Sequence, residues 1–555
     1  IAPTGGGTGG LTKISSGTLT LTAAQSYTGT TNVTGGVLEF APGASIIGGA
    51  SNVTGGTLSV TGGTLAPGAL SSASTGGAYA MSAGSMTFNT GLNMNTGNSS
   101  TNVFVNLTGG TFSSSFVTMG RCSTLINTPT QGNTTSGLYI NGATASITGA
   151  LNVGFSNSSV NSTASARIDS GSLTVGGVVL VAIASPDRWS VMDVNGGTFT
   201  STEAVTGLQV GSGQTGSNAF LVRAGTATVE RILLTQSAAS TETSLLNVSG
   251  GSLYVGSGGI VGNNNGGTGV LDVQLGTATL GAKAAWSTLL GATLNGTTTI
   301  QAADAVAAPF DIGIAGVLGG TGGFDKTGGG KLTLSGLNTY TGNTTVSAGT
   351  LEVANDDVFD DASTVSIASG ATLNLTHAGA DIVGVLVVNG ITQPDGLYTF
   401  GTGKLQVGAV VVSPYQTWAS GYGLQDPWLG VNPALNGTPG ADPDNDGIAN
   451  ELEFALGGNP TLSSTNVLPT LSVTATNFVY TFNRVDASEA EVALAFQSGT
   501  TLAAGSWTPV AIGVDTAASG SGVVVTENGA AADTIVVTIA KGANTKLFGR
   551  LQAVK

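Results

Sequence analysis

One stretch near the start of the chain recurs in its second half without insertion or deletion. Residues 11–33 read LTKISSGTLTLTAAQSYTGTTNV, and residues 324–346 read FDKTGGGKLTLSGLNTYTGNTTV. The match continues into residues 36–39 and 349–352, which read GVLE and GTLE. One supersecondary unit has therefore been used at least twice, and such repetition is typical of chains that stack their units into an array.

A looser phrase recurs between the two copies: a glycine, then Thr, Ser or Ala, then alternating apolar residues. It occurs at Gly110, Gly142, Gly171, Gly197, Gly225, Gly251 and Gly276. The intervals range from 25 to 32 residues, which is about one coil of a parallel β-helix. Within such a phrase the alternation places Leu173 and Val175 inward and the hydroxyl side chains outward, in rows along the surface.

The composition favours β structure throughout. The chain has 89 Gly, 8% charged residues and 40% apolar residues. Gly tolerates the positive φ angles of sharp corners, β-branched residues suit short strands, and the apolar content is too high for a disordered chain. We predict an all-β protein in which residues 1–412 form one parallel β-helix. The predicted interior residues are Leu19, Leu21, Val33, Leu38, Leu173, Val175, Leu253, Val255, Leu332, Leu334, Val346 and Leu351.

Charge and single residues exclude several classes of function. The net charge is −15, and 22 of the 30 acidic residues lie beyond residue 300. Neither half has the basic stripe that phosphate neutralisation requires, so we expect no nucleic-acid partner. No apolar run reaches the ~20 residues of a membrane span, so we expect no membrane insertion. The single cysteine, Cys122, is expected to have a small buried side chain. The sequence identifies no residues that could act with the single histidine, His377, in a catalytic triad.

The repeated segment resembles a known family. Residues 329–346, followed by Ala348-Gly-Thr-Leu, are similar to the autotransporter-associated β-strand repeat, also called the passenger-associated transport repeat, and the copies span residues 11–41 and 324–354. The resemblance implies secretion by a Gram-negative bacterium. It also implies a right-handed parallel β-helix at the cell surface.

The composition changes near Ser413. Trp418, Trp428 and Trp507 lie beyond it, and prolines crowd the span that follows. Residues 413–460 are interpreted as a linker and a calcium-binding loop with a short helix, resembling the calcium-loop module of many secreted bacterial repeat proteins. Residues 461–555 are predicted to form a small antiparallel β domain.

The strongest chemical signal is the sequence DPDNDGIANELE at residues 442–453. It fills the pattern D-x-D-x-D-G-x5-E, so the expected Ca²⁺ ligands are Asp442, Asp444, Asp446, the Ile448 carbonyl, Asn450 and Glu453. Only an exiting helix, about 448–456, is readable, which favours a structural site over a paired sensor. The alternative is a solvated acidic turn that caps a helix. A second acidic corner, formed by Asp356, Asp357, Asp360 and Asp361, is either another cation site or, more simply, a solvated corner.

Three classes of function remain open. The first is a structural protein, a subunit of an extracellular filament or surface layer that self-associates head to tail, with residues 1–13 of one copy against the C-terminal half of the next. The second is a cell-surface adhesin that binds glycans, such as those of cell surfaces, or other surfaces. The third is a polysaccharide-degrading β-helix enzyme, which needs clustered carboxylates with basic partners. We favour the structural protein and expect no enzymatic activity, because the first 300 residues offer few charged side chains.

Overall fold

The structure, a computed structural model, divides into two compact units, Ile1–Ala409 (unit 1) and Val410–Lys555 (unit 2). The sequence placed this boundary three residues later. The described residues are 8–94, 103–120, 137–154, 164–182, 189–211, 217–236, 243–263, 266, 268–356, 358–408, 413–424, 436–514, 519–529, 531–544 and 546–554. Cys122 and Asp357 lie outside them.

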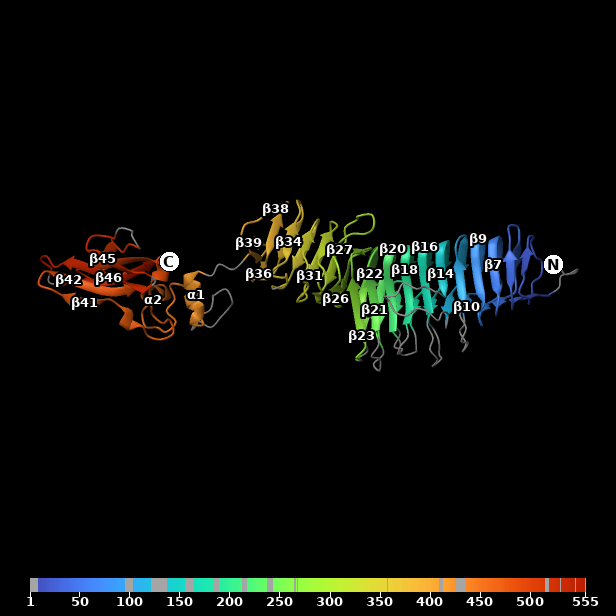
Figure 1. The fold of residues 1–555 in the computed structure, drawn as a ribbon, viewed down its shortest axis with the longest axis horizontal. Coiled ribbons are helices and arrows are strands. Elements are labelled where there is room, and N and C mark those ends of the chain that lie inside the picture. The colour runs from blue at the N-terminus through green and yellow to red at the C-terminus, as the bar shows by residue number, and fades with distance from the viewer. Residues whose placement is uncertain are drawn as a thin grey trace. The chain divides into compact units, whose positions relative to one another are not determined.

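Unit 1 consists of strands separated by tight turns (Figure 1). Its first half contains β1 (Leu11–Lys13), β2 (Thr18–Leu21), β3 (Thr31–Val33), β4 (Val37–Phe40), β5 (Ser45–Ile47), β6 (Ser51–Val53), β7 (Thr57–Ala66), β8 (Ser71–Ala73), β9 (Ala78–Phe88), β10 (Leu92–Met94), β11 (Phe104–Leu107), β12 (Thr111–Ser114), β13 (Val117–Met119), β14 (Leu138–Ile147), β15 (Leu151–Val153), β16 (Ala164–Val175), β17 (Val179–Val181), β18 (Trp189–Ser201), β19 (Leu208–Val210) and β20 (Ser217–Thr235). Its second half contains β21 (Thr243–Val248), β22 (Ser252–Asn263), β23 (Val270–Leu275), β24 (Thr279–Ala282), β25 (Trp286–Thr288), β26 (Ala292–Leu294), β27 (Thr298–Gln301), β28 (Ile312–Ile314), β29 (Leu318–Gly319), β30 (Phe324–Thr327), β31 (Lys331–Leu334), β32 (Thr344–Val346), β33 (Thr350–Val353), β34 (Thr364–Ile367), β35 (Thr372–Leu375), β36 (Ala380–Val383), β37 (Val385–Val388), β38 (Ile391–Thr392), β39 (Gly396–Phe400) and β40 (Gly403–Val407).

From β1 to β37, the strands of unit 1 pair in parallel, typically with a strand one coil away along the chain. Leu11 pairs with Thr31 and Thr31 with Ser51, so a coil here takes 20 residues. Near the middle of the unit, Leu138 pairs with Ala166 and Ala166 with Met192, giving coils of 28 and 26 residues. The prediction of an all-β repeat fold is confirmed, with longer coils between the two repeats than within them.

The interior of unit 1 is one continuous apolar cluster. Eleven of the twelve predicted interior residues are buried in it, and Leu19 in the first coils is partly buried against it. Alternation explains this arrangement: in β16, Leu173 and Val175 are buried whereas Thr174 between them is exposed. Thr174 pairs with Thr200, and Thr200 with Thr228, which confirms that hydroxyl side chains form a row across the coils.

The turns of the two repeats require glycine at matching positions. Gly36 and Gly349 have φ angles of +65° and +67°. A Cβ atom on Gly36 would lie 2.2 Å from the Ser15 carbonyl oxygen, and one on Gly349 would lie 2.5 Å from that of Gly328. Both the left-handed backbone and the close approach of the preceding coil therefore exclude a side chain.

Unit 1 changes its pairing in its last described strands. β37 and β38 form an antiparallel pair, with Val388 opposite Ile391, and β39 and β40 form another, with Phe400 opposite Gly403. β40 also pairs in parallel with β36. Among the named strands that the structure describes in this unit, these two pairs are the antiparallel ones.

Unit 2 holds two antiparallel sheets, ordered β41-β42-β46-β45 and β44-β43-β47. Its elements are α1 (Pro414–Gly421), α2 (Asn450–Leu456), the 3₁₀ helices η3 (Thr465–Val467) and η4 (Asp486–Ser488), and the strands β41 (Thr470–Val473), β42 (Asn477–Arg484), β43 (Ala493–Gly499), β44 (Thr508–Ala511), β45 (Val523–Asn528), β46 (Ala531–Ala540) and β47 (Phe548–Val554). One apolar cluster joins Tyr415 and Phe454 to Tyr480 and Phe496. Helices α1 and α2 therefore share their core with the antiparallel sheets.

Helix α1 was not predicted from the sequence. Ser413 and Gln416 form a capping box, in which the Ser413 hydroxyl accepts the Gln416 N–H at 3.2 Å and the Gln416 side chain accepts the Ser413 N–H at 2.9 Å. Pro414 follows the cap, at a position where the ring is tolerated. Tyr415 and Ala419 then point into the core.

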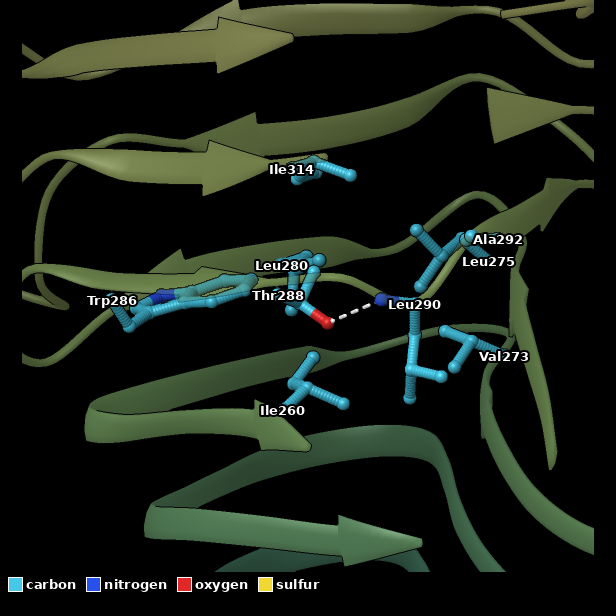
Figure 2. Close-up of a pocket in the computed structure, with 10 residues that line it drawn as sticks. Ile260, Val273, Leu275, Leu280, Trp286, Thr288, Leu290, Ala292 and Ile314 are labelled. Carbon is cyan, nitrogen blue, oxygen red and sulfur yellow. Dashed lines mark hydrogen bonds between the residues drawn. The ribbon is translucent and has the colours of Figure 1, made fainter. Parts of the chain in front are cut away.

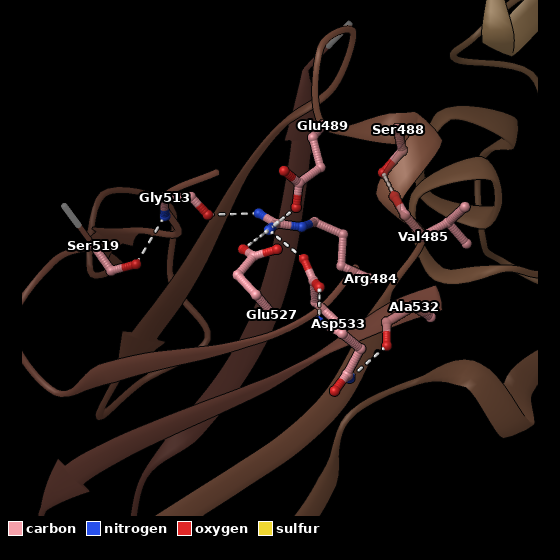
Figure 3. A network of polar contacts seen from close by, with 10 residues as sticks. Arg484, Val485, Ser488, Glu489, Gly513, Ser519, Glu527, Ala532 and Asp533 are labelled. Carbon is pink, nitrogen blue, oxygen red and sulfur yellow. Dashed lines mark hydrogen bonds and ion pairs between the residues drawn. The ribbon is translucent and has the colours of Figure 1, made fainter. Parts of the chain in front are cut away.

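Arg484 at the end of β42 is the largest fully buried side chain described in unit 2 (Figure 3). Its Nη2 lies 2.9 Å from Asp533 Oδ2 on β46, and its Nη1 donates to the Gly513 carbonyl at 2.6 Å. Glu489 also contacts Nη2, and Glu527 lies 3.9 Å from it. A buried arginine of this kind is tolerated because its charge is paired and both of its terminal nitrogens have partners.

Candidate functional site

The loop after Pro439 brings three of the predicted ligands together. Carboxylate oxygens of Asp442, Asp444 and Asp446 all lie within 4.8 Å of one another, and the three side chains are half-buried. Three hard oxygen ligands at this spacing match what Ca²⁺ requires. Their mutual repulsion is relieved when a divalent cation binds.

The backbone of the loop folds around these carboxylates. Asp442 accepts the N–H of Asp446 at 3.2 Å and the N–H of Gly447 at 2.9 Å, and Asp446 Oδ1 accepts the N–H of Ile448 at 2.9 Å. Asn445 and Gly447 have positive φ angles of +58° and +90°. The chain therefore turns back on itself at the position where the motif places its glycine.

Glu453, the last predicted ligand, is fully buried in α2. Burial, together with the negative charges of Asp444, Asp446 and Asp442, raises its pKa to about 7, and the Ser464 hydroxyl opposes this rise. Within the described part of unit 2, neither Glu453 carboxylate oxygen has a hydrogen bond of normal geometry. A buried carboxylate beside three others is costly unless it is protonated or bound to a cation.

The side chains of the other two predicted ligands, Asn450 and Ile448, are both buried. Asn450 Nδ2 donates to the carbonyl oxygens of Asn436 and Thr438, at 3.0 and 2.9 Å. The amide therefore anchors α2 to the segment before the loop. Ile448 buries its side chain, so only its backbone is available to the site.

Ser464 takes part in the site and was missed by the sequence reasoning. Its N–H donates to Asp446 Oδ2 at 2.6 Å, and its hydroxyl accepts the N–H of Asn459 at 2.6 Å. Ser464 lies eleven residues past the end of the motif, so the spacing carries no signal for it. It fixes the loop against the chain that leads to η3.

A second acidic group in unit 2 consists of Asp486, Glu527 and Asp533, whose ligand atoms also lie within 4.8 Å of one another. Here Arg484 supplies the positive charge, because its guanidinium contacts Glu527 and Asp533. The Asp533 carboxylate is further held by the N–H of Asn528 at 3.1 Å. This group is therefore an ion-pair network of the core.

The acidic corner of unit 1 is held by a residue that the sequence reasoning did not single out. Asp381, buried on β36, accepts the N–H groups of Val358 and Phe359 at 2.9 and 3.2 Å. Asp360 Oδ1 accepts the N–H of Ala362 at 3.0 Å and so closes its own turn. A cation at this corner stays a prediction.

His377 lies close to the same corner. Burial lowers its pKa, and the charge of Asp356 opposes that shift. A Cβ atom on Gly403 would lie 3.0 Å from the His377 ring, so the imidazole packs against the backbone of β40.

An ion-pair network ties neighbouring coils together in the middle of unit 1. Arg167 Nε lies 2.6 Å from Asp169, and its Nη1 lies 3.8 Å from Asp193 on the next coil. Arg223, one coil further, lies 3.5 Å from Asp193. Burial raises the pKa of Asp193, although the charges of Arg223 and Arg167 oppose this shift. The pKa of Asp169 is lowered, because the effect of burial is outweighed by hydrogen bonds from Arg167, Asn195 and Tyr139.

The surface of unit 1 is hollowed where β25, β28 and β31 lie side by side. The depression has a volume of about 400 Å³ and is lined by Ser257, Ser287, Asp311, Gly313 and Thr333, with Ala285, Trp286 and Ile312 completing it. A Cβ atom on Gly313 would lie 3.2 Å from Ser287 Cβ, so the missing side chain helps to open this space. Asp311 Oδ1 accepts the N–H of Lys331 at 2.8 Å.

Trp286 also lines a small apolar cavity inside the coils (Figure 2). Its other walls include Ile260, Leu275, Leu280 and Ile314, and its volume is about 10 Å³. Thr288 Oγ1, a polar atom of the lining residues, accepts the N–H of Leu290 at 3.0 Å. The cavity is at the lower size limit for one water molecule and is mostly apolar, so it is a packing gap and not a ligand site.

The two repeats use a lysine at matching positions to close their turns, fully buried in the second repeat and half-buried in the first. Lys326 is fully buried and donates to the carbonyls of Thr327, Gly328 and Ala348 at 3.1, 2.8 and 2.7 Å. Lys13 makes the equivalent contacts to the carbonyls of Ser15 and Gly35. Each lysine thus closes the turn of its own repeat onto the next coil.

Comparison with known families agrees with this internal symmetry. The model of the passenger-associated-transport repeat matches residues 11–40 and 324–353. Both segments are passenger-associated-transport repeats. They indicate a secreted or cell-surface protein of the autotransporter passenger type. Searches of curated proteins and of solved structures found no match. In the part of the chain that the structure describes, no helix has the length and apolar character that a membrane crossing requires.

Proposed function

We propose that this protein is a secreted structural component of the surface of a Gram-negative bacterium, a right-handed parallel β-helix that forms extracellular filaments or a surface layer. The observation that carries this proposal is the use of polar side chains to join one coil to the next. Lys331 pairs with Glu352 across adjacent strands at 3.0 Å, and Glu39 accepts the hydroxyls of Thr20 and Thr61 from the coils on either side, each at 2.9 Å.

The neutral polar side chains have the same role. Ser72 donates to Asn52 at 2.9 Å, and Asn152 donates to Thr118 at 3.2 Å, each across neighbouring coils. Hydrogen bonds of this kind stiffen a stack along its axis, because every coil is linked to the next through its backbone and its side chains. A stiff stack with few free charges is suited to a mechanical role.

Assembly is proposed to occur head to tail. Each repeat stacks its own two coils in the same register: Leu11 pairs with Thr31, and Phe324 pairs with Thr344. Because this stacking interface occurs twice within one chain, we expect that a terminal coil of one copy can also pair with a coil of another copy. Contacts of this type do not close on themselves, so the product is a filament.

We further propose one structural Ca²⁺ in unit 2, bound by Asp442, Asp444, Asp446, the Ile448 carbonyl and Glu453. Asn450, at the ninth position of the motif, is proposed as the sixth ligand, because its Nδ2 anchors α2 while its buried Oδ1 has no hydrogen-bond partner among the described residues. The buried carboxylate of Glu453, which has no compensating charge, supports this site. Burial of this carboxylate costs free energy that a bound cation offsets, whereas in a solvated acidic turn nothing offsets it.

The structural role is tested on cells that produce the protein. Gold-labelled antibody against unit 1, imaged by electron microscopy, should decorate extracellular filaments or a continuous layer. A variant that lacks residues 1–13 should be secreted as folded monomers, and the antibody should then label no filaments at the cell surface. Normal filaments from the shortened chain would exclude the head-to-tail contact, and label confined to the cell interior would exclude the surface role.

The depression beside Trp286 favours glycan binding as a second candidate. Ser257, Ser287 and Thr333 offer hydroxyls and Asp311 offers a carboxylate along a depression that is wide open to solvent. The carboxylate disfavours anionic ligands, so neutral sugars are the class expected. A glycan array should then show binding that Gly313→Val abolishes by filling the depression and that Thr174→Val, on an exposed row elsewhere, retains. Equal binding by both variants would remove this candidate.

A further inference from the structure

Strand β41 is an edge of the four-stranded sheet of unit 2 (Figure 1). It pairs antiparallel with β42, with Leu471 opposite Tyr480 and Val473 opposite Phe478. Among the described strands, β42 is its pairing partner. All four of its side chains are exposed, Leu471 by 50% and Val473 by 54%. The outer side of an edge strand carries backbone N–H and C=O groups that a further strand can use.

The apolar side chains of β41 lie on the core side of the sheet. Opposite residues of paired strands share a face, and Tyr480 and Phe478 belong to the apolar cluster of unit 2. Leu471 and Val473 therefore lie on the same face of the sheet as the apolar core, but at its solvent-exposed edge. Apolar side chains at such an edge favour the addition of a strand that carries apolar side chains on the same face.

The two edges of this sheet are protected differently. β45, the opposite edge, includes Glu527, whose charge disfavours strand addition. β41 reads Thr-Leu-Ser-Val and contains no charge and no proline. Pro469 stands directly before it and limits the strand that can pair to these few residues.

We propose that β41 pairs with the same strand of a second copy, antiparallel and with Ser472 on the two-fold axis. In this register Leu471 lies opposite the partner's Val473, and Val473 lies opposite the partner's Leu471. The apolar side chains of both copies then share the core face, and Thr470 and Ser472 share the outer face. The alternation about Ser472 makes the strand complementary to itself, which is why a second copy is the expected occupant.

The resulting contact closes as a dimer and joins the two four-stranded sheets into one. It is made by unit 2 alone, so it does not depend on head-to-tail stacking of coils. Together with such stacking, it would pair neighbouring filaments side by side.

The contact is tested by disulfide trapping in the full-length chain. Ser472→Cys, in a Cys122→Ala background, places two thiols on opposite strands at a Cβ separation of about 4.5–5.5 Å, close enough to be bridged. Mild oxidation should give a covalent dimer. Val524→Cys, on β45 and 59% exposed, is the matched control and should crosslink roughly tenfold less. Equal crosslinking at both positions would overturn the proposal.

Charged substitutions give an independent readout. Leu471→Lys combined with Val473→Lys should weaken dimer formation by at least about tenfold in sedimentation experiments, whereas Val524→Lys should leave it unchanged. Near-ultraviolet circular dichroism should show that both variants keep a packed unit 2. If the unaltered protein shows neither dimers nor side-by-side filaments at its highest soluble concentration, the edge does not bind a second copy and the proposal is wrong.

Discussion

The phenol oxygen of Tyr340 lies 2.6 Å from Thr344 Oγ1 inside its coil, and Tyr27 and Thr31 form the same contact at 2.9 Å in the first repeat. All four side chains are buried. The repeats therefore preserve an internal hydrogen bond as well as a surface pattern. The tyrosine ring fills the interior, and its hydroxyl satisfies a threonine that faces inward where most neighbouring positions are apolar.

Removal of this bond should destabilise unit 1. Tyr340→Phe leaves the Thr344 hydroxyl without its partner in the interior, at an expected cost of about 1–3 kcal/mol. Tyr398→Phe is the control, because its hydroxyl bonds to the Pro394 carbonyl at an exposed position, where water can replace it. Urea unfolding followed by circular dichroism measures both variants. Equal losses of stability would mean that the buried hydrogen bond has no special role.

A substitution at Lys326 tests whether this buried lysine closes the second repeat. Lys326→Met keeps the length of the side chain but leaves three carbonyl oxygens without their donor, so we expect a loss of about 1–3 kcal/mol in the free energy of unfolding. Lys331→Met, five residues away, removes only a half-exposed ion pair with Glu352 and should cost less than about 1 kcal/mol. The same urea titration separates them, and the account requires the larger loss at Lys326.

Calcium removal should affect one unit only. Chelation should lower the melting temperature of unit 2 and leave the melting of unit 1 unchanged, because the three aspartates repel one another when no cation is bound. Asp444→Asn should abolish most of the calcium response, whereas Glu451→Gln, on the same helix as Glu453, should retain it. Differential scanning calorimetry with and without chelator measures the shift. An unchanged melt, with no heat of calcium binding in titration calorimetry, would remove the site.

The pH dependence of unit 2 without calcium should report on Glu453. Its pKa rises from 4.5 when unfolded to about 7 when folded, so the folded state binds more protons than the unfolded state between these values. The stability of the calcium-free protein is therefore expected to fall as pH rises from about 4.5 to about 7. Glu453→Gln should remove this part of the slope.

Calcium should act in the opposite sense, because it binds the ionised carboxylate: its affinity should rise over the same pH range. Melting temperatures at several pH values, with and without chelator, measure both trends. A calcium-free slope that is identical in the wild-type protein and in Glu453→Gln would contradict this assignment.

Arg484 should be the most sensitive charged residue of unit 2. Arg484→Met leaves the fully buried Asp533 without its positively charged partner and should cost about 3–5 kcal/mol. Arg550→Met removes an exposed guanidinium that lies 4.2 Å from the centre of the Trp507 ring and should cost about 1 kcal/mol. If the two losses measured by chemical unfolding are similar, the buried network is not the anchor of this core.

The stacked coils could be predicted because their signal is local and periodic. A glycine at the turn, an apolar residue at every second position and a repeat of the phrase after one coil are enough to place Leu173 and Val175 inside. The same pattern cannot show that Lys326 is also inside. A lysine at a strand end usually faces solvent, and its burial depends on three carbonyls that only the folded turn brings together.

The candidate metal site could be predicted in part for the same reason. The spacing of Asp442, Asp444 and Asp446 on one loop is a local property, and the structure brings these carboxylates together. Ser464 and Asp381 act across long separations in sequence, so no motif contains them. Helix α1 was missed because Pro414 and the aromatic residues after it suggest a loop, although the capping box at Ser413 was a readable signal.

Electron microscopy of the purified chain, with calcium and over a range of protein concentrations, tests the central claim most directly. The account predicts unbranched filaments that lengthen as concentration rises and whose axial repeat equals one subunit. Dispersed single particles at every concentration, from protein whose two units both melt cooperatively, would contradict the proposal that this is a self-assembling structural protein.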